Sequence, residues 1–234
     1  DTYWLSKPVR TAFQHRHSAS VAGGTDVFRY SLDLNLAMQP GVMKESKNQT
    51  KGVNFNMTYL KNKFTMRTNI NLSESNSQNS PYGSFSQYTR LNQYYIPTDN
   101  EGNQKKVIDN NLVSGQSRII TNPMYDATVG IKDVTNSLNI AANLSLEYMI
   151  LDNLRITEQL AYTRGMAGTD RFLPADHTSF ELEDDLTRKG SYFKSSGNMS
   201  SWSSNMGINY NLVLGKHLIS AFGNWTISED RNDY

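Results

Sequence analysis

The most regular feature of the sequence is a two-residue alternation of apolar and polar positions. In Phe28–Met38 every second residue is apolar, and the residues between them are Arg29, Ser31, Asp33, Asn35 and Ala37. The same alternation recurs in segments 53–59, 64–72, 138–148, 154–162 and 206–212. A period of two is typical of β-strands with one apolar face. With His17–Ala22 before these segments and His217–Ile227 after them, the pattern predicts an all-β fold of about eight strands.

The predicted strands are long, at about 11 to 13 residues each. Strands of soluble proteins commonly have about 5–6 residues, whereas a tilted strand needs about 9–11 residues to cross the hydrocarbon core of a membrane. A soluble β-sandwich also alternates between apolar and polar positions. Strand length, together with a second face rich in charge, Asn, Ser and Thr, favours a transmembrane barrel with lipid outside and water inside.

The connectors between the predicted strands alternate between short and long. Tight turns occupy Gly23–Thr25, Leu60–Lys63, Ile150–Asn153 and Val213–Lys216. Long connectors occupy residues 39–50, 73–136 and 165–201. Outer-membrane barrels have short turns on the periplasmic side and long loops outside. The sequence therefore predicts an antiparallel up-and-down meander, which is a partial transmembrane β-barrel with short periplasmic turns and long extracellular loops.

Two details concern the apolar side of this predicted barrel. Aromatic residues stand beside the tight turns, at Tyr59, Phe64, Tyr148 and Tyr210. They match the aromatic girdle of a membrane barrel, although aromatic residues also favour strands in general. Glu158 falls on the apolar side, where contact with lipid is unfavourable for a charge. A bulge, a polar partner or a different strand register would each account for Glu158.

The composition narrows the range of functions. The 23 Lys and Arg residues nearly balance the 22 Asp and Glu residues, so the net charge of +1 gives no electrostatic reason to bind nucleic acid. The absence of Cys excludes disulfide bonds and thiolate metal sites. The sequence contains no run of about 18 apolar residues that would predict a transmembrane helix. The strands of a membrane barrel, in contrast, cross the membrane with a low average hydropathy. The 25 Asn and 25 Ser residues, about a fifth of the chain, fall largely on the polar side of the strands and in the long loops.

Short motifs distributed in order along the chain resemble the SusC/RagA family of TonB-dependent transporters of the Bacteroidetes outer membrane. The motifs at the start of the chain are Trp4, Arg10-Thr11-Ala12-Phe13, Ser20-Val21-Ala22-Gly23-Gly24-Thr25, Arg29-Tyr30-Ser31 and Gln39-Pro40-Gly41-Val42. Those further on are Asn92-Gln93-Tyr94-Tyr95-Ile96-Pro97-Thr98-Asp99 with Gly102, Asn122-Pro123-Met124-Tyr125, and Asn209-Tyr210-Asn211 followed by Lys216-His217. Gln93 stands where the family commonly has Pro, and Pro40 stands where an acidic residue is common.

The resemblance implies a function and a set of partners. The family imports oligosaccharides or peptides across the outer membrane, with a SusD-like lipoprotein on the extracellular side and TonB acting from the periplasm on a plug domain. Because the chain begins at Asp1 without a signal-peptide pattern, we expect it to be part of a longer protein. The resemblance implies that residues 1–16 are a connector from a missing plug domain and that residues 17–234 are a partial β-barrel.

The candidate ligand-binding residues lie in the longest predicted loop. Its tyrosines Tyr82, Tyr88, Tyr94 and Tyr95 stand among Ser, Asn, Gln and Gly residues. Aromatic faces with neutral amide and hydroxyl groups suit oligosaccharides or peptide backbones, although the tyrosines could instead pack the loop against itself. A row that includes Arg29, Asp33, Arg67, Arg155 and Arg164 is expected to face the lumen or the plug.

Catalytic and metal-binding chemistry is weakly represented. His15 and His17 share one face of a strand but have no evident third ligand. An acidic cluster, made up of Glu181, Glu183, Asp184 and Asp185, could bind Ca²⁺, but a solvated loop explains it better. No nucleophile elbow or phosphate-binding loop occurs. The sequence thus predicts no enzyme, no cofactor and no metal site. The alternative to a transporter is a β-rich surface adhesin or ligand-binding module built as a soluble sandwich.

Overall fold

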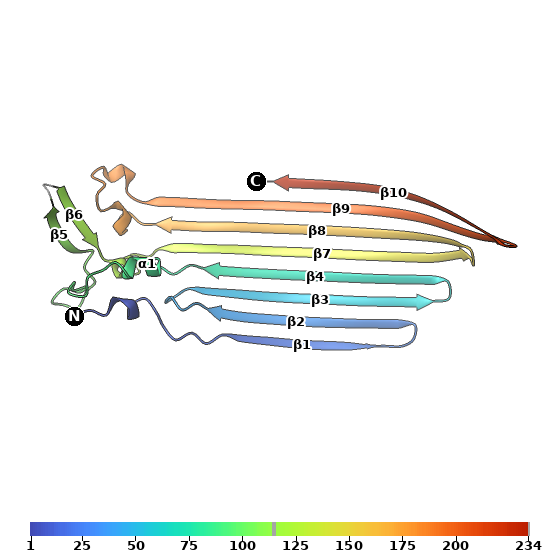
Figure 1. Ribbon diagram of the computed structural model, residues 1–234, viewed down its shortest axis with the longest axis horizontal. Coiled ribbons are helices and arrows are strands. Elements are labelled where there is room, and N and C mark those ends of the chain that lie inside the picture. The colour runs from blue at the N-terminus through green and yellow to red at the C-terminus, as the bar shows by residue number, and fades with distance from the viewer. Residues whose placement is uncertain (114–115, 234) are drawn as a thin grey trace.

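The computed structural model describes residues 1–113 and 116–233, and its main feature is one eight-stranded antiparallel sheet (Figure 1). The strands are β1 (His15–Gly24), β2 (Phe28–Pro40), β3 (Lys47–Lys61), β4 (Phe64–Gln78), β7 (Lys132–Leu151), β8 (Leu154–Leu173), β9 (Ser191–Leu214) and β10 (His217–Asp233). They pair in chain order, and the sheet is open because β1 and β10 each have one neighbour. The predicted all-β meander is confirmed.

Short turns and long connectors lie at opposite ends of the sheet, which we call the turn end and the loop end (Figure 1). Asn62 and Gly215 adopt left-handed φ values of 54° and 60° in two of the tight turns. Such values fit the right-handed twist of the flanking strands, and Asn and Gly tolerate them best. The four predicted tight turns are all present at the turn end.

The long connectors contain short elements of their own. Residues 79–131 include α1 (Phe85–Tyr88), β5 (Val107–Val113), β6 (Gln116–Thr121) and α2 (Pro123–Asp126). Residues 174–190 include the 3-10 turns η2 (Thr178–Phe180) and η3 (Leu186–Arg188), and η1 (Trp4–Ser6) precedes β1. The described helices are all too short and too polar to cross a membrane.

The strand register sorts the side chains onto an apolar face and a polar face. On the apolar face, Leu32 pairs with Phe55, which in turn pairs with Ile70 of β4. Leu144 pairs with Leu160 further along the sheet. These side chains belong to an apolar band in the half of the sheet nearer the turn end. Since the sheet is a single layer, the side chains of the band are half-buried or exposed, and an apolar surface of this extent indicates an interface.

Several strands extend well beyond the apolar band toward the loop end. The strands range from 10 to 24 residues, so the predicted strand length of 11 to 13 residues is wrong. The predicted bounds of the long loops, 39–50, 73–136 and 165–201, are wrong for the same reason. The connectors observed are residues 41–46, 79–131 and 174–190. In the added segments polar residues such as Glu74 and Asn76 occupy the apolar face. Alternation disappears there because both faces are polar, while the backbone pairing continues.

Glu158 and Arg164 are charged residues that lie among apolar residues on the apolar face. Glu158 lies in regular register, opposite Leu146 and Met206, and its carboxylate accepts a hydrogen bond from the Ser204 hydroxyl at 2.6 Å. Of the three explanations left open by the sequence, a polar partner is therefore the one observed. Arg164 lies opposite Ile140 and thus also on the apolar face, so its predicted place in the lumen-facing row is wrong.

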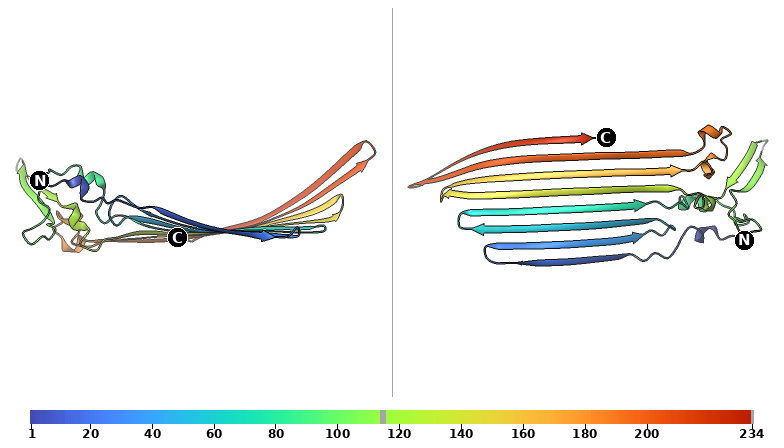
Figure 2. Two further views of the ribbon diagram at one scale, coloured as in Figure 1. Left: turned by 90° about the horizontal axis from the view of Figure 1, so that it is seen from below. Right: turned by 180° about the vertical axis from the view of Figure 1, so that it is seen from behind.

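The sheet is curved, and the loop end and the β9–β10 turn rise on the same side of it (Figure 2). The loops on that side line a cavity together with Asp133 and Arg171, which both belong to the polar face. The polar face is therefore the concave face. This combination of a concave polar face and a convex apolar face is that of a segment of barrel wall with a polar interior.

Candidate functional site

The connectors at the loop end form a packed layer with a small core. This loop layer comprises residues 1–14, 41–46, the described part of 79–131, and 174–190. Among the described residues, its most deeply buried side chains include Trp4, Tyr88 and Asn122, at 3%, 1% and 0% exposure. The loops thus supply the hydrophobic core that a single sheet lacks.

Trp4 anchors the start of the chain in this layer. Its indole Nε1 donates a hydrogen bond to the Asn92 carbonyl at 2.9 Å, and its ring lies 6.5 Å from that of Tyr88. Thr2 donates through its hydroxyl to the Tyr95 carbonyl at 2.8 Å. The segment before β1 therefore lies at the loop end, and the interpretation of residues 1–16 as a plug connector stays a prediction.

The same segment also pairs with the connector between β2 and β3. Val9 and Met43 form an isolated antiparallel bridge, and the Lys44 amide donates to the Pro8 carbonyl at 2.7 Å. The Arg10 guanidinium donates to the Ser46 carbonyl at 2.9 Å. Residues 1–10 consequently connect two loops that are far apart in the sequence.

Asn122 fixes the middle of the long connector. Its side-chain amide donates to the Pro97 carbonyl at 3.1 Å and to Gln104 Oε1 at 3.2 Å. Its Oδ1 accepts from the Met124 amide at 3.0 Å, so Asn122 also caps α2. A buried amide whose donor and acceptor atoms are all used in this way stabilises one loop conformation.

The Asp-x-x-Gly motif forms a turn in the same connector. Asp99 Oδ1 accepts from the backbone amides of Glu101 and Asn103, both at 2.9 Å, and Gly102 has a φ of 90°. The Asn103 amide contributes most to lowering the pKa of the Asp99 carboxyl group. The two motifs that carried the resemblance in this loop therefore both determine its backbone conformation.

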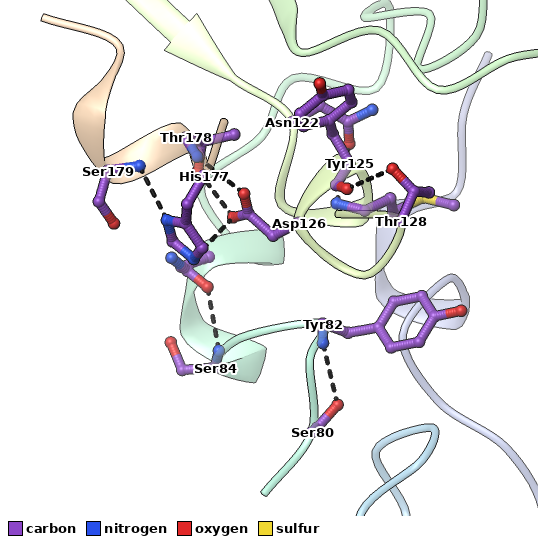
Figure 3. A network of polar contacts seen from close by, with 12 residues as sticks. Ser80, Tyr82, Ser84, Asn122, Tyr125, Asp126, Thr128, His177, Thr178 and Ser179 are labelled. Carbon is purple, nitrogen blue, oxygen red and sulfur yellow. Dashed lines mark hydrogen bonds and ion pairs between the residues drawn. The ribbon is translucent and has the colours of Figure 1, made fainter. Parts of the chain in front are cut away.

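Asp126, His177 and Thr178 form a polar cluster, which we call the clasp, and it joins the two largest connectors (Figure 3). The Asp126 carboxylate accepts from the Thr178 amide at 2.8 Å and from the Thr178 hydroxyl at 2.7 Å. His177 Nε2 lies 3.6 Å from Asp126 Oδ2, while His177 Nδ1 accepts from the Ser179 amide at 3.0 Å. Burial lowers the pKa of His177 and outweighs the opposing effect of Asp126. The clasp therefore favours the neutral imidazole.

An ion pair provides a second link between these connectors. Lys106 Nζ lies 2.8 Å from Glu181 Oε2, with both side chains about a quarter exposed. Partial burial acts to lower the pKa of Lys106, but the hydrogen bond and charge of Glu181 outweigh it and raise the pKa. Glu181 thus belongs to a loop-to-loop contact rather than to an isolated acidic cluster.

The four candidate tyrosines have different environments. Tyr88 is buried, donates its hydroxyl to the Tyr82 carbonyl at 2.9 Å, and has a pKa raised by burial. Tyr82 is half-buried, with Lys44 Nζ 5.7 Å from its ring centroid. A hydrogen bond to Asp109 raises the pKa of the half-buried Tyr95, and Tyr94 is 69% exposed. Tyr88 packs the loop layer and presents no free face, whereas Tyr94 is open to a ligand.

A cavity of about 440 Å³ lies between the loop layer and the polar face. Its lining includes Ser80 and Ser84 before α1, His177 of the clasp, and Asp133 and Arg171 on the strands. Arg171 Nε lies 3.8 Å from Asp133 Oδ2. The cavity thus offers hydroxyl groups, a guanidinium and a carboxylate on the concave side of the sheet.

The register places the remaining candidates on the polar face. Arg29 and Arg67 both pair with Thr58 of β3, Asp33 pairs with Asn54, and Arg155 lies 3.6 Å from Glu147. Side-chain amides connect the strands between these charges. Asn69 donates to Asn54 Oδ1 at 3.0 Å and to Asn56 Oδ1 at 2.7 Å. Their orientation toward a lumen or a plug stays a prediction.

The candidate metal ligands do not gather into a site. His15 Nδ1 lies 3.1 Å from His17 Nε2, as a hydrogen-bonded pair. Asp185 accepts from the Thr187 amide and hydroxyl, which lower the pKa of its carboxyl group. Among the residues that the structure describes, no group of three or more His, Cys, Asp or Glu side chains could hold a metal ion.

Sequence reasoning did not identify the clasp. Asp126 and Thr178 are separated by 52 positions, and no local pattern connects them. The Asn-Pro pair before α2 is a recognisable capping signal, but it does not indicate which segment the carboxylate at the end of α2 contacts. Such a contact becomes visible only once the strands bring the two connectors to the same end of the sheet.

Comparisons with known proteins give matches at the level of structure. No protein-family model matches the chain, and no curated protein sequence does. The RagAB peptide importer in its open-open state aligns with a TM-score of 0.71 and 16% identity over 99% of this chain and 26% of that chain. The closed-closed state of this importer aligns with a TM-score of 0.68 and 16% identity over 100% of this chain and 27% of that chain. The open form of the ferric-catecholate import receptor Fiu from E. coli K12 aligns with a TM-score of 0.55 and 12% identity over 95% of this chain and 33% of that chain.

These proteins are importers and a receptor rather than enzymes, and the chain spans about a quarter of the RagAB chain that it matches. At such low identity the comparison concerns the fold. The motifs had indicated a resemblance to the SusC/RagA family, and the structural neighbours include RagA, a SusC-like TonB-dependent transporter. The fold agrees with that resemblance: the chain has the fold of part of the barrel of the RagAB peptide importer.

Proposed function

We propose that the chain forms part of the barrel wall and the substrate-side loops of a TonB-dependent importer in the outer membrane of a Gram-negative, Bacteroidetes-like bacterium. The observation that carries the proposal is the curved two-faced sheet, which has its apolar band outside and its loop layer folded over the polar side. A soluble adhesin would have to cover the apolar band with a second layer of protein.

The dimensions of the apolar band support contact with lipid. In β7 the band runs from Leu138 to Tyr148 on every second residue. A tilted strand needs about 9–11 residues to cross the hydrocarbon core, and this segment has the required length. Tyr148 and Tyr210 lie at its turn-end border, where an interfacial aromatic girdle is expected.

The polar face and the loop layer support the import of oligosaccharides or peptides. The side chains between the charged residues of the polar face are mainly Asn, Ser and Thr, whose amide and hydroxyl groups bind neutral polar ligands. Tyr82, Tyr94 and Tyr95 remain candidate contacts at the entrance, with Tyr88 as their support. Arg29, Asp33, Arg67 and Arg155 would hold the plug or line the lumen.

The loop end is the side on which a SusD-like lipoprotein would bind. The RagAB structures are of a transporter with such a partner, and the packed loop layer here would present a defined surface to one. TonB would act on the plug from the periplasmic side, at the turn end. No cofactor, metal or nucleic acid has a role in this proposal.

The proposal is tested with the full-length protein in a Gram-negative host. We expect it in the Sarkosyl-insoluble outer-membrane fraction, with a mobility on gels that changes on heating. We also expect uptake of labelled oligosaccharides or peptides that depends on TonB. Solubility without detergent would contradict the barrel, and uptake that persists without TonB would contradict the importer.

A further inference from the structure

Arg164 is a permanently charged residue on the apolar face of β8. It lies opposite Ile140 of β7 and Ser200 of β9, one row inside the loop-end border of the apolar band, which the Leu138–Met166 pair marks. Its side chain is exposed and has no hydrogen-bond or ion-pair partner within the part of the chain that the structure describes. Because a guanidinium does not deprotonate in proteins, Arg164 requires an anion or water at this position.

A second arginine lies in the same row of the sheet. Ser200 pairs with Arg231 of β10 as well as with Arg164. Since neighbouring strands lie about 4.8 Å apart, the Cα atoms of the two arginines are separated by about 10 Å, with Ser200 between them. Two guanidinium groups at this spacing can reach the oxygens of one phosphate group, and the serine hydroxyl can donate to it as well.

Two carboxylates also lie near Arg231 on the apolar face. Asp233 Oδ2 lies 3.4 Å from Arg231 Nε, which leaves the two Nη groups of Arg231 for another anion. Glu229 accepts a hydrogen bond from the indole of Trp202 at 3.0 Å. Both carboxylates thus have partners of their own, and neither neutralises Arg164.

The other charges next to the apolar band are mostly paired with each other. Lys51 forms an ion pair with Glu74 at 3.1 Å, and Lys132 forms one with Asp170. These exposed pairs balance their own charge. Arg164 differs from them because its neighbours on the same strand face are Tyr162 and Met166.

Aromatic residues indicate the depth of this row in a membrane. Tyr162 and Trp202 pair in the next row toward the turn end, and each is 42% exposed. Tyr and Trp with an apolar body and a polar tip are enriched at the level of lipid headgroups. Arg164, one row nearer the loop end than this pair, therefore lies close to the headgroup level on the loop side, where a long arginine side chain can extend to the phosphates.

The polar part of the strands beyond this row favours a lipid with sugars above its phosphate. From Ser200 to Ser191, β9 continues for about 30 Å at 3.3 Å per residue, or about 20 Å along the membrane normal at a tilt of 45°. A phospholipid headgroup layer is only about 5–8 Å deep on each side. Polar residues such as Asn198 and Ser196 in this segment suit contacts with sugars.

We propose that Arg164, Ser200 and Arg231 bind a phosphate group of a glycolipid in the outer leaflet of the outer membrane. The guanidinium groups hold the phosphate, the aromatic pair lies against the upper part of the acyl chains, and the polar segment of β9 contacts the sugars. This site lies on the outside of the barrel wall, and it rests on the outer-membrane location in the proposed function.

The test measures lipid binding to the full-length protein, purified in a mild detergent, by native mass spectrometry. The probes are synthetic phosphorylated lipid A, the same lipid A after enzymatic dephosphorylation, and phosphatidylglycerol. The variants are Arg164→Gln and, as a matched control, Arg90→Gln, because Arg90 is an exposed loop residue away from the sheet. Heat-modifiable mobility is recorded for every sample.

We expect Arg164→Gln to weaken binding of phosphorylated lipid A about ten-fold, which corresponds to loss of one charge-assisted interaction. Arg90→Gln should bind as the unmodified protein does, and the dephosphorylated lipid should bind weakly to all three. Equal binding by Arg164→Gln and the unmodified protein would overturn the site, as would equal affinity for phosphatidylglycerol. Loss of heat-modifiable mobility in the unmodified protein would instead overturn the proposed function.

Discussion

The Ser204 hydroxyl donates a 2.6 Å hydrogen bond to the Glu158 carboxylate on the apolar face, across strands β8 and β9. The neighbours of Glu158 in the register are Leu146 and Met206, so the pair lies within the apolar band. A carboxylate in such surroundings depends on its few hydrogen-bond donors, because water and other polar groups are scarce.

Replacing Ser204 and replacing Glu158 should change the free energy of unfolding in opposite directions. We expect Ser204→Ala to lower the free energy of unfolding by about 1 kcal/mol, because the carboxylate loses its donor. Glu158→Leu should raise it by a similar amount, because an apolar side chain suits contact with lipid. Urea unfolding of the full-length protein in lipid vesicles measures both, and destabilisation by Glu158→Leu would show that the carboxylate does not face lipid.

Trp4 is expected to control the order of the loop layer. In Trp4→Ala the packing against Tyr88 and the hydrogen bond to Asn92 are both lost, at a cost of about 3–5 kcal/mol within the layer. Limited trypsin digestion of the full-length protein should then cleave faster after Arg90, while the barrel remains heat-modifiable. Trp4→Phe keeps most of the packing and serves as the control, with a smaller effect. Equal cleavage rates in all three proteins would contradict this role.

The clasp should weaken in acid. Burial lowers the pKa of His177, so the clasped state binds a proton less readily than the open state does. Its stability is therefore complete above the ordinary histidine pKa of about 6.5 and decreases as the pH falls below that value. Hydrogen exchange in segment 174–190, corrected for intrinsic rates, should accelerate from pH 7.5 to pH 5.5. His177→Gln should abolish this pH dependence, and an unchanged dependence in that variant would assign it to another group.

The isolated chain should not form a pore. Strands β1 and β10 each have one unpaired edge, and lipid cannot satisfy the backbone groups there. The expected result is no single-channel conductance from the refolded 234-residue chain in planar bilayers. Steady channels of one size would show that the chain closes or assembles into a barrel.

The sequence predicted the apolar band of the sheet better than the rest of the fold. Phe28–Met38 alternates strictly, and its strand was correctly placed. Glu74 and Asn76 were assigned to a loop because polar residues occupy both faces there, although β4 continues to Gln78. Alternation of apolar and polar residues shows only that the two faces of a strand have different environments. Backbone pairing between strands can continue where the alternation ends.

The candidate site was less predictable because it depends on contacts between distant segments. Tyr88 was selected as an aromatic loop residue, but only the approach of Trp4 determines that it is buried. Asp126 and Thr178 carry no local signal for their contact. Arg164 is different, because it has the same parity as Leu160 and Tyr162, so the alternation alone already placed it on the apolar face, as the register shows.

The central claim is that the convex apolar face of the sheet contacts lipid while the concave face contacts water. These 234 residues contain no Cys, so single cysteines introduced at the adjacent positions Leu144 and Ser145, which lie on opposite faces of β7, are the only thiols in this part of the protein. Thiols react as thiolates, which form poorly in an apolar environment. In outer membranes containing the full-length protein, a small water-soluble maleimide should modify Ser145→Cys and leave Leu144→Cys largely unmodified. Equal modification of both, or the reverse order, would contradict the account.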